Sequence, residues 1–162
     1  MAAPCDVVVT TNSGFPLDQN LYQSVKALSA AARIVATGGI IVLVSECSDA
    51  LPSHGNFGSL LQKGLPPGDL LDGLRGQKKT LLDQWQAQTL AATVSKARVA
   101  VHSALPADLV VRLGLEVAGD LQATVDGALR ARGPGARAAM MPGGPLTIPY
   151  LSSSNEVTTG GR

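Results

Sequence analysis

Apolar residues along this chain occur in two alternating patterns, short continuous runs and longer stretches with helical spacing. The first run, at residues 6–11 (DVVVTT), is rich in β-branched residues and ends in the turn-forming sequence NSG, which predicts a buried strand. From residue 17 to about residue 37, apolar side chains recur every three or four positions, as in an amphipathic helix. We expect Gly38-Gly39 to end this helix and residues 40–45 (IIVLVS) to form a second buried strand.

The same two patterns continue as far as residue 141. They predict helices at 57–63, 68–74, 80–97, 106–113 and 120–132, and strands at 98–103, 116–118 and 137–141. Strands that are apolar throughout and alternate with helices are typical of a parallel sheet covered on both faces. We therefore expect a three-layer, Rossmann-like α/β domain with a mostly parallel sheet over residues 1–151, followed by a disordered polar tail at 152–162.

Composition excludes several classes of function. Hydrophobic residues make up 45% and charged residues 15% of the chain, as in a compact globular protein. A net charge of +1 gives no strong attraction to nucleic acid or to an anionic membrane. The longest apolar run, at residues 40–44, is too short for a bilayer, which takes about 20 residues. Two cysteines and an N-terminus without a signal-peptide pattern lead us to expect a cytoplasmic protein with reduced thiols.

The segment after the first strand carries the densest candidate chemistry. Ligands of parallel α/β sheets bind beyond the carboxyl ends of the strands, and Asn12 follows the first strand directly. In the next helix, Gln23 and Lys26 are three residues apart and share one face with Tyr22 nearby. An ammonium beside an amide donor suits a carboxylate ligand. By spacing alone, however, such a pair is more typical of a solvated helix face.

Residues 12–28, NSGFPLDQNLYQSVKAL, resemble the signature of the C-terminal domain of the lactate racemase family. The family pattern runs approximately SNGGYPLDxNLYQxxKAL, so that Ser13 and Phe15 stand where Gly and Tyr are commoner. Shorter similarities follow at residues 38–41, 45–47, 83–85 (DQW) and 141–144 (MPGG). Together they cover nearly everything from residue 6 to about residue 149.

The resemblance implies one half of a nickel-dependent racemase or epimerase of 2-hydroxyacids. In that family an N-terminal domain holds a nickel pincer nucleotide and catalytic histidines, while the C-terminal domain closes over the site and helps to hold the substrate carboxylate. Carried over by motif, Gln23 and Lys26 are expected to bind that carboxylate and Trp85 to border the site. The chain begins five residues before its first predicted strand. We therefore expect the cofactor-bearing domain to come from elsewhere, in cis or in trans, and no metal to bind to this chain alone.

Other residues and other functions have simpler interpretations. His54 is predicted in a loop and His102 inside a strand, and the two form no metal-ligand motif. Cys47 follows the second strand, where a packing role is expected. One alternative function is a stand-alone, non-catalytic module that binds 2-hydroxyacids or regulates a partner. Another is an orphaned fragment of a longer gene product.

Overall fold

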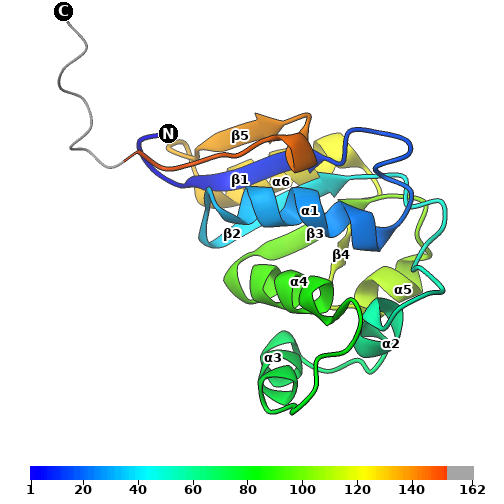
Figure 1. Ribbon diagram of the computed structural model, residues 1–162. Helices are drawn as coiled ribbons and strands as arrows, with labels where there is room; N and C mark the ends of the chain where they lie inside the picture. The colour runs from blue at the N-terminus through cyan, green and yellow to red at the C-terminus, as the bar shows by residue number, and fades with distance from the viewer. Residues whose placement is uncertain (153–162) are drawn as a thin grey trace, which may run out of the picture.

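The computed structural model describes residues 1–152, which form a three-layer α/β arrangement around a five-stranded sheet (Figure 1). The strands are β1 (Cys5–Thr11), β2 (Val35–Val44), β3 (Arg98–His102), β4 (Glu116–Val117) and β5 (Ala138–Met141). They lie in the order β4-β3-β2-β1-β5, and every pairing is parallel. The predicted α/β fold with a mostly parallel sheet is thus confirmed.

Helices cover the two faces of the sheet unequally. They are α1 (Leu21–Ala32), α2 (Phe57–Leu61), α3 (Pro67–Arg75), α4 (Gln84–Lys96), α5 (Ala107–Arg112) and α6 (Leu121–Arg132), followed by the 3₁₀ turn η1 (Gly144–Leu146). The larger apolar cluster joins one face of the sheet to α1 through α5. The smaller cluster packs the other face against α6. Right-handed crossovers explain the division, because the connection through α6 returns across the sheet to β5 in the opposite direction.

The first helix is shorter than the sequence pattern predicts. It spans α1 only, and its N-cap is Asn20, whose side chain accepts a hydrogen bond from Gln23 N at 3.0 Å. The prediction that Gly38-Gly39 end this helix is wrong, because both glycines lie inside β2. Strand β2 begins at Val35, which is buried and pairs with the start of β1, and an irregularity in the register follows. Burial in the sheet thus overrides the helical periodicity there.

The remaining elements lie close to their predicted positions. Helix α4 begins only at Gln84, four residues later than predicted, since Asp83 before it has a left-handed backbone with φ 62°. Helix α6 has Asp120 as its N-cap, because the Asp120 carboxylate accepts from Ala123 N at 2.9 Å. No helix within residues 1–152 is long and apolar enough to cross a membrane.

After η1 the chain runs back along the sheet to the N-terminus (Figure 1). The terminal ammonium of Met1 donates to Tyr150 O at 3.0 Å, and Ser152 N donates to Met1 O at 2.8 Å. The predicted disordered tail at 152–162 lies outside the described residues except for Ser152.

Candidate functional site

The loop between β1 and α1, residues 12–20, is held by hydrogen bonds at the carboxyl edge of the sheet. Asn12 is buried, and its side-chain amide donates to Leu17 O, while its Oδ1 has no partner within the described part of the chain. The loop after β2 is tied to the same place, because Cys47 N donates to Asp18 O at 2.8 Å and Leu21 N donates to Ala50 O at 3.0 Å. These bonds set the position of the first turns of α1.

Gln23 and Lys26 are in direct contact on the outward face of α1. The Lys26 ammonium donates to Gln23 Oε1 at 2.5 Å. Because an ammonium can only donate, this bond orients the Gln23 amide and leaves its Nε2 as a donor for a ligand. Among residues 1–152, Lys26 has no ion pair with an acidic side chain. The two side chains therefore present hydrogen-bond donors and one positive charge, which is the chemistry that a carboxylate requires.

Aromatic side chains from α1 and α4 meet beside this pair. The Tyr22 ring lies edge-on to Trp85, with the centroids 6.2 Å apart, and edge-on to Phe57 at 5.4 Å. The Tyr22 hydroxyl donates to Asp83 Oδ1 at 3.1 Å. Burial and this contact with a carboxylate raise the pKa of Tyr22, so the hydroxyl stays protonated and remains a donor. Trp85 is 52% exposed, which leaves its indole available to a ligand rather than to the core.

The structure thus brings together four of the five predicted site residues. Tyr22, Gln23 and Lys26 lie on the first two turns of α1, and Trp85 lies on the first turn of α4 against Tyr22. Asn12 is placed differently, inside the loop that supports α1. A binding role for each of these residues stays a prediction.

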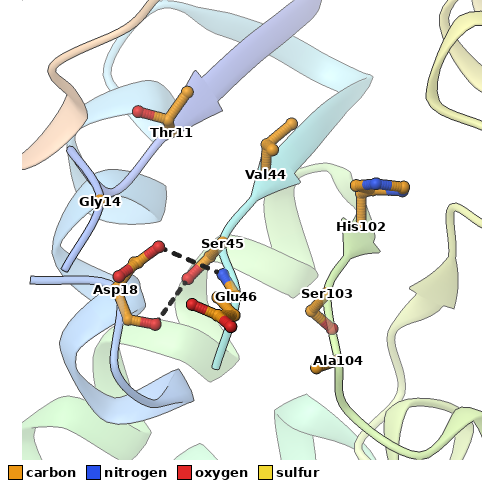
Figure 2. Close-up of a pocket in the computed structure, with 9 residues that line it drawn as sticks. All are labelled: Thr11, Gly14, Asp18, Val44, Ser45, Glu46, His102, Ser103 and Ala104. Carbon is orange, nitrogen blue, oxygen red and sulfur yellow. Dashed lines mark hydrogen bonds between the residues drawn. The ribbon is translucent and has the colours of Figure 1, made fainter. Parts of the chain in front are cut away.

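A separate cavity of about 520 Å³ opens at the carboxyl ends of β1, β2 and β3 (Figure 2). Its polar lining comes from Thr11, Asp18, Ser45, Glu46, His102 and Ser103. The His102 ring is oriented by Nδ1, which donates to the backbone carbonyl of Ala118 at 2.7 Å. These residues were not among the site residues predicted from the sequence, although the same edge of the sheet was expected to bind a ligand. The available signal was a polar pair at the end of two apolar strands, Ser45-Glu46 after β2 and His102-Ser103 at the end of β3.

The described residues do not assemble a metal centre. Within residues 1–152, no three His, Cys, Asp or Glu side chains lie close enough together to hold a metal ion. Cys5 and Cys47 are buried free thiols, and burial raises the pKa of Cys47, so this thiol stays protonated. His54 is exposed in the loop before α2. A nickel-containing group therefore has no fitting set of ligands in this part of the chain.

Comparison with known proteins assigns the family. The sequence model of the lactate racemase C-terminal domain matches residues 1–148. The chain belongs to this family. The resemblance carried by residues 12–28 is therefore confirmed.

Curated relatives and a solved structure agree with this assignment. The lactate racemase of Thermoanaerobacterium thermosaccharolyticum is 40% identical over 100 residues, which cover 60% of this chain and 23% of the relative. The lactate racemase of Lactiplantibacillus plantarum is 32% identical over 145 residues, 88% of this chain and 34% of the relative. The structure of the T. thermosaccharolyticum lactate racemase apoprotein superposes with a TM-score of 0.81 at 28% identity, covering 92% of this chain and 36% of that one. The chain thus spans only about a quarter to a third of these relatives.

Proposed function

We propose that this domain holds the carboxylate of a small 2-hydroxyacid for a racemase or epimerase of the lactate type. The observation that carries the proposal is the contact between Gln23 and Lys26, which presents only donors and an ammonium without an acidic partner in the described residues. Both curated relatives are named lactate racemase. The alternative of a stand-alone binding module gains no support from these comparisons.

The arrangement suggests how such a substrate is oriented. One carboxylate oxygen accepts from the Lys26 ammonium and the other accepts from Gln23 Nε2. The edges of Tyr22 and Trp85 then border the organic part of the substrate. Holding the carboxylate in this way orients C2 and its hydroxyl toward groups on a second protein surface, which lowers the entropic cost of the reaction.

The remaining chemistry belongs to a partner domain in this proposal. The nickel cofactor and the catalytic histidines that the family resemblance implies are assigned to a cofactor-bearing N-terminal domain, joined in cis or bound in trans. Residues 1–152 bring together no set of metal ligands. No step through nickel is therefore assigned to this chain, whose residues bind and orient the substrate.

Lactate titration of the chain tests the proposal, because Trp85 is its only tryptophan and its fluorescence reports on the site. We expect a saturable change with lactate and none with lactamide, which lacks the carboxylate. Lys26→Met keeps the aliphatic stem and removes the charge. The exposure of Lys26 places its contribution at the low end for charged hydrogen bonds, so we expect affinity to fall about ten-fold.

A matched control separates this effect from a change in overall charge. Lys78 is also an exposed lysine, and Lys78→Met should bind lactate like the unmodified chain. Equal lactate affinity of Lys26→Met and Lys78→Met would contradict the assignment of the carboxylate site.

A further inference from the structure

Asp83 occupies the N-cap of α4 in an unusual way. An N-cap aspartate ordinarily has an extended backbone and accepts from an amide of the first helical turn. Asp83 instead has a left-handed backbone, with φ 62° and ψ 10°, and its side chain makes no capping hydrogen bond. Its Oδ1 accepts from the hydroxyl of Tyr22 at 3.1 Å, across 61 residues of sequence. The carboxylate is thus turned away from its own helix and toward α1.

The loop before α2 lies against the Asp83 carboxylate. A Cβ placed on Gly55 would lie 1.9 Å from Asp83 Oδ2, so only glycine allows the observed approach. The next residue, Asn56, donates to Leu82 O from both its backbone N and its Nδ2, each at 3.2 Å. The loop is therefore anchored to the residue before Asp83, and Gly55 and Tyr22 together confine the carboxylate.

Tyr22 in turn links Asp83 to the proposed carboxylate site. Its ring contacts Trp85 edge-on at 6.2 Å, and its backbone carbonyl accepts from Gln86 Nε2 at 2.7 Å. Gln23 is the next residue on α1 and contacts Lys26. The Tyr22 hydroxyl is thus the atom through which Asp83 contacts the ring that packs against Trp85.

We propose that Asp83 is a positioning residue, which accepts the Tyr22 hydroxyl and thereby holds Tyr22 against Trp85 as a fixed wall beside the Gln23–Lys26 pair. The inference rests on the proposed function for its effect on substrate, but its effect on Trp85 stands by itself. Asp83 contacts no substrate in this account. It acts through Tyr22, at the cost of its own helix cap.

Two substitutions separate the role of the carboxylate from that of the backbone. Asp83→Gly removes the acceptor, and the relief of the left-handed backbone offsets the lost hydrogen bond, so we expect the domain to remain folded with little change in thermal stability. Without the acceptor, Tyr22 is released and acrylamide quenching of Trp85 changes. Lactate affinity falls about five-fold, because binding must then order the Tyr22 side chain. Asp83→Asn keeps an acceptor oxygen and tolerates the left-handed region. The Trp85 quenching and the lactate affinity of Asp83→Asn should lie within about two-fold of those of the unmodified chain, since only the charge is lost.

A double-mutant cycle with Tyr22→Phe tests whether Asp83 acts through Tyr22. If it does, Asp83→Gly produces no further change in Trp85 quenching once the Tyr22 hydroxyl is absent. An equally large effect of Asp83→Gly on Trp85 quenching in the Tyr22→Phe protein would overturn the inference. It would also be overturned if Asp83→Gly alone left Trp85 quenching unchanged. Failure of the unmodified chain to bind lactate would count against the proposed function alone, because the Trp85 cycle still decides the positioning role.

Discussion

Gly144 is the position where one added methyl group should cost the most stability near the site. It begins η1, which packs against α1. A Cβ on Gly144 would lie 2.4 Å from Thr10 Oγ1, 2.6 Å from Ala27 Cβ and 2.6 Å from Thr11 O. A backbone oxygen and a helical Cβ cannot rotate away, so β1, α1 and η1 would have to separate. Gly144 therefore sets how closely the helix that carries Lys26 approaches the sheet.

The magnitude of the Gly144→Ala effect follows from this overlap. Overpacking a closely packed contact typically costs about 1–3 kcal/mol. For a domain of this size, each kcal/mol lowers the melting temperature by roughly 2–4 °C. Taking about 2 kcal/mol, we expect a melting temperature roughly 4–8 °C lower, measured by far-UV circular dichroism.

The neighbouring glycine supplies the control. A Cβ on Gly143 would meet nothing closer than Ser13 Oγ and Thr147 Oγ1, both at 3.9 Å, and its φ of −118° is open to any residue. Gly143→Ala should therefore have the same melting temperature as the unmodified chain. Equal melting temperatures for Gly143→Ala and Gly144→Ala would refute the argument that close approach at η1 positions α1.

Two further predictions concern the loops around the site. Ser13 has a φ of 68° and a buried hydroxyl without a partner in the described residues. Ser13→Gly should therefore raise the free energy of unfolding, measured by urea titration, by roughly 0.5–1 kcal/mol. The control Ser29→Gly, on the exposed face of α1, should lower the free energy of unfolding, and a higher value for both variants would argue against backbone strain at Ser13. Burial raises the pKa of Cys47 above its unfolded value, so its contribution to stability is present below about pH 8.5 and is lost as pH rises through the folded-state pKa. Unfolding in urea from about pH 7 to about pH 10 should show this alkaline loss, and Cys47→Ala should make it smaller; an identical decline in both proteins would exclude the thiol as its source.

Local patterns in the sequence were enough for much of the fold. Continuous apolar runs marked β1, the second half of β2 and β3, because buried parallel strands are apolar on both faces. The pattern failed where tertiary pairing competes with helix periodicity. Val35 continues the apolar helical spacing of the residues before it, yet it lies in β2 beside β1. Pairing with a strand some 30 residues earlier leaves no mark in the local sequence.

For the candidate site, the sequence by itself determined the Gln23–Lys26 pair. Residues three apart share a helix face whatever surrounds the helix, and the contact in the structure is of this local kind. The family assignment likewise depended on a continuous motif, residues 12–28, and needed no coordinates.

Only the tertiary structure decided what stands beside that pair. Tyr22 meets Asp83 and Trp85 because α1 and α4 pack together on one face of the sheet. The close approach of Gly55 to the Asp83 carboxylate and the cavity at the ends of β1, β2 and β3 arise in the same way. These contacts join segments far apart in the chain, and their geometry is set by the packing of whole elements. A single sequence records the residues that take part but not the distances between them.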